Sequence, residues 1–521
     1  MARNTIVFSV ATGLSRIAGL AREIVASSFF ATSGPFSAFT IAFQVPNLVR
    51  SLFADAALSS AFVPVFTELL EKGRRREAFR LASTLFFVIA AILGLLTVVF
   101  IAAAGVVVPL FTGGGFDHSL DQLTVGLSRV LFPIVLLLAI NGLLVGVLNA
   151  YDHFGVPAIS PLVWNVVILV FLVGSRVVLS GDAQLYGYAV GIVAGTLVQL
   201  LMTLPVLRRL GFHLELSFDW RDPRVLQVLR LMLPVTIGLG IINFDLLINS
   251  TLGSLISDQA PRAIDAAFRI YMLPQGMFSV AVATVLFPAM SRYAARADLV
   301  GLRGLLARGL RQISLLLIPA GAATLALATP ITRLIYEHGS FGDQSTAEVA
   351  KALFWFSFSL PFSGINLLLT RTFFSLQMPW RPTTLALGSL VVNLGVSLAL
   401  YRPLGIAGPV IGTAVANLAM AAMQAHWVSR ELGGIEARET LGAIFAIVVA
   451  SVVLGAVAWL VWTGLDQLLG RGLLAELISV GGGLVAGAYA YLRCVLFLRI
   501  PEAHRTWRYL SARVPALRSL A

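Results

Sequence analysis

Charged residues are scarce in this sequence. Asp, Glu, Lys and Arg make up 12% of its 521 residues, whereas hydrophobic residues make up 58%. A soluble globular domain has about 25% charged and 45–50% apolar residues. So few polar side chains could not cover so many apolar ones in water, and lipid is therefore the expected solvent. The sequence predicts an all-α polytopic membrane protein.

Several chemical signatures are also missing. Cys494 is the single cysteine, which excludes an internal disulfide framework and CxxC chemistry. The six histidines lack H-E-x-x-H spacing, so the sequence indicates no zinc site and leaves any metal unknown. No phosphate-binding loop of the G-x-x-x-x-G-K-[ST] type occurs, and the acids are scattered over different loops. We therefore expect no ATP hydrolysis, no cofactor and no enzymatic activity.

Long apolar runs take the place of these signatures. A helix needs about 20 mostly apolar residues to cross the hydrocarbon layer. On that rule the sequence predicts fourteen transmembrane helices. They cover residues 5–30, 36–60, 82–110, 126–150, 157–180, 185–207, 230–253, 263–288, 310–334, 348–376, 382–401, 405–429, 440–464 and 472–498.

The basic residues are distributed unequally between the loops on the two sides of the membrane. Of the 37 Lys and Arg residues, 24 fall in loops on the side of the N-terminus and 7, Arg262 among them, on the other side. Cytoplasmic loops are enriched in Lys and Arg, so both termini are expected in the cytoplasm. Topology and anionic membrane lipids then explain most of the net charge of +12, and no nucleic-acid partner is needed.

Short motifs recur at an offset of about six helices. F-T-G-G-G-F ending at Phe116 matches Y-E-H-G-S-F ending at Phe341, and four other pairs fall close to the same offset. An even number of helices gives both copies the same orientation, as in many duplicated transporters. We expect two parallel-related six-helix lobes at 1–215 and 216–435, followed by two C-terminal helices and a basic tail at 436–521. A duplicated scaffold without transport is the alternative.

Ionisable residues inside the predicted spans gather in the first two helices of each lobe. A charged side chain at a helix centre costs about 2.5–3.5 kcal/mol, so such residues tend to face a cavity or a partner. Guanidinium groups suit diphosphates and carboxylates, because they donate paired hydrogen bonds and stay charged. We therefore predict a cavity for an anionic cargo, with snorkelling or pairing, for example of Arg22 with Asp55, as the alternative. The residues concerned are Arg16, Arg22, Glu23, Arg50, Asp55, Asn243, Asp245, Asp265 and Arg269.

The first helices carry a family resemblance. The run S-R-I-A-G-L-A-R-E from Ser15 to Glu23 resembles the first-helix signature of the MurJ (MviN) family of lipid II flippases. That family lies within the multidrug/oligosaccharidyl-lipid/polysaccharide exporter superfamily. The resemblance continues in F-Q-V-P-N-L-V-R, which includes Asn47 and ends at Arg50, in A-F-V-P at Pro64, and in Arg269 five residues before Pro274.

The resemblance implies a function. It implies movement of lipid II, an undecaprenyl-diphosphate disaccharide-pentapeptide, from the inner to the outer leaflet of a bacterial plasma membrane by alternating access. Arg16, Arg22, Arg50 and Arg269 match the family's cavity arginines, which hold the diphosphate. Glu23 matches an acid that closes the outer gate, and the last two helices form a groove for the lipid tail. The cell-wall synthesis machinery is a further possible partner.

The sequence departs from the family at one gate position. Ser37 stands where many members have an acid, and its mate in the repeat is Asp265, so we predict that Asp265 supplies the missing carboxylate. Ser15, Asn47 and Asp55 are expected to support the site.

Coupling to membrane potential or to a sodium or proton gradient is open. Asp245 is a possible ion ligand, and Asn393 is the polar residue that the eleventh helix offers.

Two other functions remain. A flippase for another polyprenyl-diphosphate-linked glycan, of the teichoic-acid or O-antigen type, would share the fold and the cavity charge. A cation or drug antiporter of the same fold is disfavoured, because such cavities are usually acidic.

Overall fold

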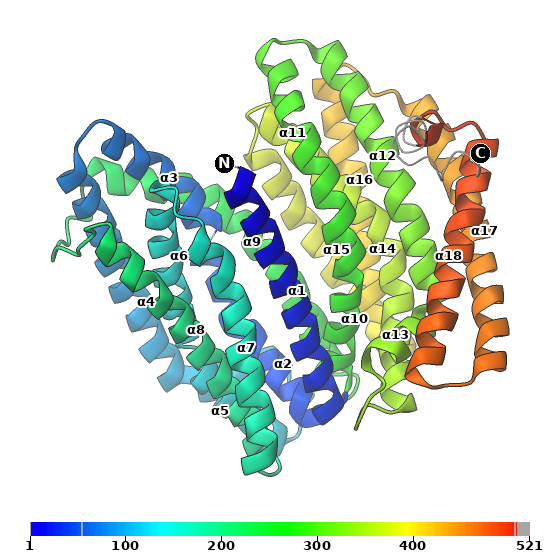
Figure 1. Cartoon of the computed structure of the whole chain (residues 1–521), viewed down its shortest axis with the longest axis horizontal. Coiled ribbons are helices and arrows are strands. Elements are labelled where there is room, and N and C mark those ends of the chain that lie inside the picture. The colour runs from blue at the N-terminus through cyan, green and yellow to red at the C-terminus, as the bar shows by residue number, and fades with distance from the viewer. Residues whose placement is uncertain (1, 54–55, 505–506, 508–521) are drawn as a thin grey trace. The chain divides into compact units, whose positions relative to one another are not determined.

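The computed structural model describes residues 2–53, 56–504 and 507 (Figure 1). That part of the chain contains eighteen α-helices and one π-helical turn, and no strand. The predicted all-α fold is confirmed. The helices are α1 Ala2–Phe30, α2 Gly34–Phe53, α3 Ala56–Glu71, α4 Arg75–Thr112, α5 His118–Leu131, α6 Ile134–Ala150, α7 Gly155–Val178, α8 Ala183–Arg209, α9 Pro223–Ser254, α10 Ala260–Pro274, η1 Gln275–Ser279, α11 Val280–Ala295, α12 Leu299–Ala326, α13 Ala328–Tyr336, α14 Asp343–Ser375, α15 Trp380–Leu404, α16 Ala407–Glu431, α17 Ala437–Leu469 and α18 Leu473–Phe497.

Each predicted span falls on helical structure, and three of the spans, 126–150, 263–288 and 310–334, are interrupted within the described residues. The span at 36–60 covers α2 and the start of α3, and the span at 126–150 covers α5 and α6. The span at 263–288 covers α10, η1 and α11, and the span at 310–334 covers the end of α12 and α13. Within the described residues, ten helical segments are long and apolar enough to cross a membrane. A protein with many membrane-spanning helices follows, in agreement with the prediction.

Proline explains two of the breaks. Pro133 stands between α5 and α6, and Pro274 ends α10 immediately before the π-helical turn η1. Proline has no N–H to donate and its ring displaces the carbonyl of the preceding turn, so the regular hydrogen-bond ladder fails there. The α10–η1–α11 segment therefore continues as a helix with a local irregularity, a form that often occurs at functional sites.

The turn from α4 to α5 shows how local chemistry ends one helix and starts the next. Gly113 adopts the left-handed conformation, with φ of 61°, at the end of α4. Asp117 then accepts a hydrogen bond of 2.8 Å from the backbone N–H of Leu120 and caps α5. This bond, together with one from Ser119, lowers the pKa of the Asp117 carboxyl below its ordinary value. Glycine at a helix end and aspartate at a helix start are the residues that these positions favour.

The chain forms two compact units. Unit 1 comprises Met1–Arg262 and His338–Gly342, and unit 2 comprises Ala263–Glu337 and Asp343–Ala521. The predicted lobe boundary at 215 differs from the end of unit 1 because α9 packs against α2, α3 and α4. Val225 and Val228 of α9 are fully buried in the core of that unit. The division into two units leaves the duplication untested, so the two six-helix repeats stay a prediction.

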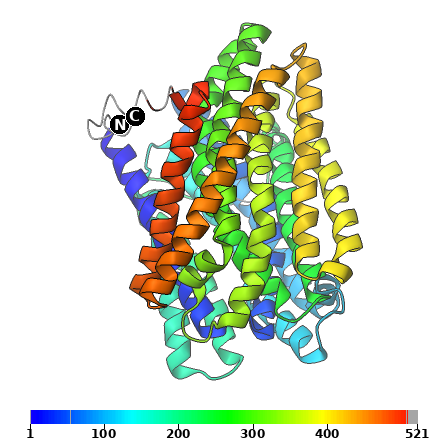
Figure 2. The ribbon, with the colours of Figure 1, turned by 90° about the vertical axis from the view of Figure 1, so that its right-hand side faces the viewer.

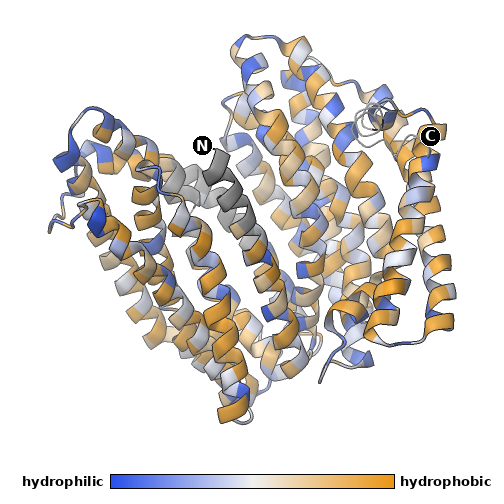
Figure 3. Ribbon diagram, in the orientation of Figure 1, coloured by the Kyte–Doolittle hydropathy of each residue, from blue (hydrophilic) through white to orange (hydrophobic). Residues whose placement is uncertain are grey.

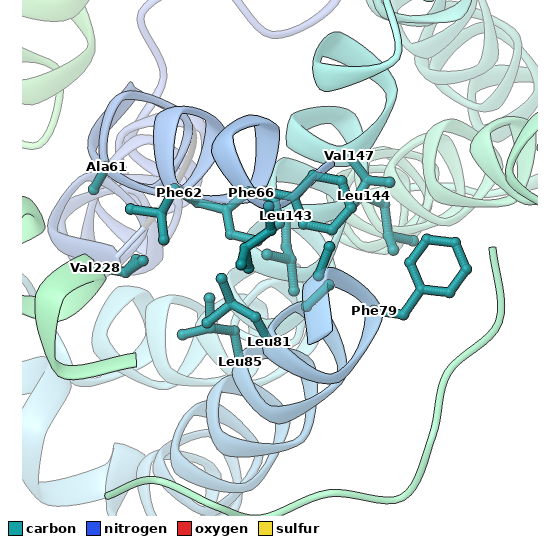
Figure 4. Close-up of a cluster of buried hydrophobic side chains, with 14 of the residues drawn as sticks. Ala61, Phe62, Phe66, Phe79, Leu81, Leu85, Leu143, Leu144, Val147 and Val228 are labelled. Carbon is teal, nitrogen blue, oxygen red and sulfur yellow. The ribbon is translucent and has the colours of Figure 1, made fainter. Parts of the chain in front are cut away.

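The core of unit 1 is rich in phenylalanine. Phe62 and Phe66 of α3 are fully buried and lie 5.0 Å apart between ring centroids. Figure 4 shows them packed among Leu143 and Leu144 of α6 and Leu85 of α4. A second cluster includes Phe100 of α4 and Phe132, whose rings stack with centroids 3.7 Å apart. These contacts join the helices of unit 1, and neither cluster includes a residue of α1.

In unit 2 the last two helices pack closely on each other and on α12. Figure 2 shows α17 and α18 side by side, and apolar residues follow their length in Figure 3. A Cβ at Gly483 would lie 2.7 Å from the carbonyl oxygen of Ala458, so only glycine permits this approach. Tyr491 of α18 also donates a 2.7 Å hydrogen bond to the carbonyl of Leu315 on α12. The C-terminal pair is therefore an integral part of unit 2.

Candidate functional site

The first helix presents two of the predicted arginines in different settings. Arg16 is exposed in the middle of α1. Arg22 is half-buried, with its guanidinium carbon 4.9 Å from the centre of the Trp164 ring on α7. Its Nε is buried and has no hydrogen-bond partner among the described residues. Since an aromatic face attracts a cation without using its N–H donors, Arg22 is held in place with hydrogen-bonding capacity to spare.

Helix α7 also holds the backbone of α1 next to Arg16 and between the two arginines. The side-chain amide of Asn165 donates to the carbonyl of Ser15 at 3.3 Å and to the carbonyl of Pro161 at 2.9 Å. Gly19 lies beside the same amide, and a Cβ there would lie 3.6 Å from the Asn165 oxygen. Asn165 therefore helps to set the position of Arg16 and Arg22 along α7.

The most buried charge in the described residues belongs to Arg262, in the first turn of α10. Its side chain is 1% exposed, and its Nη2 lies 2.5 Å from an oxygen of Glu23, which is 5% exposed. The same nitrogen donates to Ser27 Oγ at 2.7 Å, and the guanidinium carbon lies 4.2 Å from the centre of the Phe36 ring. All of these residues belong to unit 1. A buried ion pair with additional hydrogen bonds is a geometry in which burial of both charges is tolerated.

Ser37 completes this cluster. It is fully buried on α2, and its Oγ accepts a hydrogen bond of 3.3 Å from the backbone N–H of Arg262. The first N–H groups of a helix have no partner within the helix, so Ser37 caps α10 from a neighbouring helix. We call Glu23, Ser27, Phe36, Ser37 and Arg262 the buried charge cluster. The cluster brings together two predicted gate residues, Glu23 and Ser37.

The sequence-based assignment of Arg262 to a loop was wrong. The predicted span began at 263, whereas α10 begins at Ala260 and includes Arg262 in its first turn. Burial against Glu23 then removes Arg262 from the count of solvent-facing loop arginines. The spacing Arg262, Asp265, Arg269 was the available signal, because residues three, four and seven apart lie on one face of a helix.

Arg269 lies on α10 in unit 2 and has a carboxylate partner on its own helix. Its Nε lies 2.8 Å from Oδ2 of Asp265, one turn earlier. Arg269 is about one-third exposed, whereas Asp265 is mostly buried. Asp265 therefore contacts Arg269, and its predicted role as substitute for the acid absent at Ser37 stays a prediction.

The remaining predicted residues are distributed over both units. Asn47 is half-buried on α2, next to Pro46. Arg50 lies on the same helix, but its side chain is outside the described part of the structure, as is the whole of Asp55. Asp245 is half-buried on α9 of unit 1, and Asn393 is buried on α15 of unit 2, where it accepts a 2.9 Å hydrogen bond from Ser397. Among the described residues, no three His, Cys, Asp or Glu side chains gather as a metal site would require.

One cavity lies within unit 2, away from these residues. It has a volume of about 500 Å³ and is lined by α12, α13 and α14, with Arg333 and Lys351 among its polar groups. None of the predicted arginines lines it. Arg333 is already flanked by Glu337 and Glu476, at 3.6 and 3.9 Å, so its charge is largely balanced.

Known structures share this fold. An inward closed conformation of the lipid II flippase MurJ matches with a TM-score of 0.78 at 22% identity, over 95% of this chain and 99% of that one. An inward-facing transporter of the multidrug resistance MATE family, in the MOP superfamily, matches with a TM-score of 0.69 at 14% identity, over 82% of this chain and 98% of that one. The fold class of this chain is thus the one that these two solved structures share.

The sequence comparisons narrow this class. The family model described as "Lipid II flippase MurJ" matches residues 25–477. The lipid II flippase MurJ of Burkholderia cenocepacia is 32% identical over 387 residues, 73% of this chain and 75% of that protein. A "Probable lipid II flippase MurJ" of Vibrio cholerae is 26% identical over 512 residues, 96% of each chain. The chain belongs to the MurJ family, a family of transporters and not of enzymes, and the resemblance inferred from the first helices is confirmed.

Proposed function

We propose that this protein moves lipid II across the plasma membrane of a bacterium, from the inner to the outer leaflet. The observation that carries the proposal is membership of the MurJ family over residues 25–477. Residues 16 and 22 are arginines on the first helix, in the arrangement from which the sequence predicted an anionic cargo. Lipid II is such a cargo, because its diphosphate carries negative charge next to a long apolar chain.

The arginines are proposed to bind the diphosphate. An unaided diphosphate does not cross hydrocarbon, because loss of its hydration is too costly. Arg22 has a buried Nε that no described residue satisfies, and Trp164 fixes its position. A guanidinium held in this way loses little freedom when it binds, and it offers paired N–H donors to phosphate oxygens. Arg16, Arg50 and Arg269 are proposed to join Arg22 in an alternating-access cycle.

The proposed orientation has both termini in the cytoplasm. It follows from the concentration of basic residues in the loops on the side of the N-terminus. Since Cys494 is the single native cysteine, a Cys494→Ser background allows a new cysteine to be placed at Lys72 or at Arg402. Labelling of intact cells with a membrane-impermeant thiol reagent should modify position 402 and spare position 72. Modification of position 72 alone would show that the orientation is the opposite of the proposed one.

Rescue of cells tests the cargo. Cells depleted of their own lipid II flippase should grow when this protein is supplied, and lipid II should become accessible in the outer leaflet. Arg16→Ala and Arg269→Ala should abolish rescue at unchanged expression, whereas Arg402→Ala, an exposed arginine outside the proposed site, should not. Rescue by both site variants would contradict the arginine assignment. Failure of the wild-type protein, with rescue of a teichoic-acid or O-antigen flippase mutant, would favour a different lipid-linked glycan.

The driving force is proposed to be membrane potential or an ion gradient. Asp245 on α9 is the candidate ion ligand because its half-buried carboxylate lies on a predicted transmembrane helix. Dissipation of the potential and of the sodium and proton gradients, one at a time, should identify which of them lipid II movement requires. An Asp245→Asn variant that keeps its gradient dependence would remove Asp245 from this role.

A further inference from the structure

The link between α8 and α9 has an unusual distribution of side chains. Residues 213–220, which we call the interfacial segment, carry no helix or strand and alternate between polar and apolar side chains. The apolar ones point outward: Leu216 is 83% exposed, Phe218 54% and Trp220 56%. An alternating segment at the surface of a protein in water would present the opposite face.

Two residues of the interfacial segment, Glu215 and Ser217, bond to the protein, whereas His213 and Asp219 are exposed. The backbone N–H of Glu215 donates to Ser83 Oγ at 3.0 Å, and Ser217 Oγ lies 2.7 Å from Thr84 Oγ1. Both partners are on α4, in the first three turns of that helix. These bonds fix which face of the segment points outward, so the exposure of the apolar side chains is built into unit 1.

The link between α8 and α9 runs along α4 as far as Phe87 and then comes back to the first turn of α4. Before the interfacial segment, the carbonyl of Leu210 accepts a hydrogen bond from Arg75 at the start of α4. At its far point the Phe218 ring lies 5.4 Å from that of Phe87, between centroids. After it, Arg224 pairs with Glu77 at 2.5 Å, back in the first turn of α4. With a rise of about 1.5 Å per residue, the chain between Leu210 and Phe218 extends along about 18 Å of α4, from position 75 to position 87.

Beyond the far point of the segment, the outer surface of α4 becomes apolar. Exposed apolar side chains of α4 begin with Ile92 and Leu95, about two turns beyond the Phe87 contact. α4 is one of the helices apolar enough to span a membrane. The exposed Leu216 and Phe218 therefore extend the apolar surface of α4. They do so at the end where α4 would leave the membrane.

Basic side chains flank the segment. Arg208, Arg209 and Arg221 are exposed on either side of it, and the Arg221 guanidinium lies 4.9 Å from the centre of the Trp220 ring. The acids nearby are engaged with the protein: Asp219 pairs with Arg80 at 3.3 Å, and Asp222 caps α9 through the N–H of Arg224 at 2.8 Å. Aromatic rings at headgroup depth and arginines beside them are typical of membrane interfaces.

We propose that the interfacial segment anchors unit 1 in the bilayer interface by binding anionic phospholipid. Leu216, Phe218 and Trp220 lie between headgroups and acyl chains, and Arg208, Arg209 and Arg221 bind lipid phosphate. The anchor sets the depth at which α4 and α9 enter the membrane. The anchor involves none of the arginines proposed to bind cargo. The anchor proposal can therefore be tested independently of the proposed transport function.

Spin labels measure the depth of the segment directly. In a Cys494→Ser background, a label at Leu216→Cys or Phe218→Cys is compared with one at Lys72→Cys, an exposed site at the same end of unit 1. The protein is reconstituted in vesicles of phosphatidylcholine with an equal part of phosphatidylglycerol. The ratio of collision rates with oxygen and with a water-soluble nickel chelate should be severalfold higher at 216 and 218 than at 72. Equal ratios at all three sites would overturn the proposal and leave this surface for a protein partner.

Removal of the flanking charge tests the lipid headgroup. In Arg208→Gln/Arg209→Gln/Arg221→Gln, the label at 216 should lose the increase in depth that phosphatidylglycerol gives over phosphatidylcholine alone. The matched control Arg292→Gln/Arg296→Gln/Arg308→Gln removes the same charge from exposed positions in unit 2 and should keep that increase. An equal response of both triple variants to phosphatidylglycerol would overturn phosphate binding by the three flanking arginines.

Discussion

Two arginines of unit 1 differ in the groups that surround them: Arg22 lies on α1, and Arg262 lies on α10 and pairs with Glu23 of α1. Arg262 is almost fully buried, and a carboxylate, a hydroxyl and an aromatic ring surround its guanidinium. Arg22 contacts an aromatic ring, and its buried Nε lacks a hydrogen-bond partner among the described residues. A guanidinium whose charge is already neutralised by a bound carboxylate has little to offer an anion, whereas one held by a ring keeps its charge and donors available. The contrast separates an arginine that supports the structure from one suited to binding.

The largest expected effect is on stability, at Arg262. Arg262→Ala would remove the guanidinium that pairs with the buried Glu23, and loss of one partner of a buried pair costs about 3–5 kcal/mol. Thermal unfolding in detergent should show a large fall in Tm. The double variant Arg262→Ala/Glu23→Gln should recover part of it, because the buried carboxylate charge is then removed as well. A single variant as stable as the wild type would show that the pair does not hold α10 to α1.

Arg22 should show the opposite behaviour. Arg22→Ala loses a cation–π contact of about 0.5–1 kcal/mol, so Tm should change little. Lipid II movement should nevertheless fall by at least about tenfold, which corresponds to roughly 1.4 kcal/mol of lost stabilisation. Arg22→Lys keeps the charge and loses the planar fork, so partial activity is expected. Full activity of Arg22→Ala would contradict the idea that Arg22 binds cargo whereas Arg262 supports the structure.

Ser37 tests the edge of the buried charge cluster. Ser37→Ala removes the acceptor for the backbone N–H of Arg262, a loss of about 0.5–1.5 kcal/mol. The unfolding transition should shift by less than that of Arg262→Ala. The companion variant Ser180→Ala serves as a control, because Ser180 is an exposed serine of unit 1 outside the buried charge cluster. Equal shifts for Ser37→Ala and Ser180→Ala would indicate that the cap on α10 adds nothing.

The smallest expected effect on stability is at Asp265. Its pair with Arg269 is of the one-turn helical kind and is partly exposed, so Asp265→Asn should cost only about 0.3–0.5 kcal/mol. Flipping measurements address its predicted gate role. Loss of flipping in both Asp265→Asn and Glu23→Gln would support a shared gate function. Flipping that survives Asp265→Asn and is abolished by Glu23→Gln would end the idea that Asp265 replaces the missing acid.

Much of the fold was predictable because it depends on local sequence. Apolar runs long enough for a bilayer gave the positions of the helices, and Pro133 and Pro274 stand at two of the breaks inside predicted spans. The boundary of unit 1 was not predictable in the same way. α9 reads as the first helix of a repeated half, but Val225 and Val228 pack into the core of unit 1.

The residues of the candidate site also differ in whether the sequence alone could reveal them. Arg16, Arg22 and Arg269 became candidates because a charge in an apolar run stands out in the sequence. Asn165 and Trp164 were missed, since an amide and a tryptophan on another helix give no such signal. The interfacial segment was also missed, because a polar and apolar alternation does not say which face points outward until Ser83 and Thr84 are seen to bind one of them.

The sequence by itself determined that lipid is the solvent, that the chain is helical and that a few arginines lie where charge is costly. These are properties of composition and of residues near one another in the chain. Only the tertiary structure decided that Arg262 is bound to Glu23 while Arg22 rests on Trp164. Partners more than a hundred residues apart are chosen by which helices pack together, and the energy of a buried charge depends on the groups that surround it.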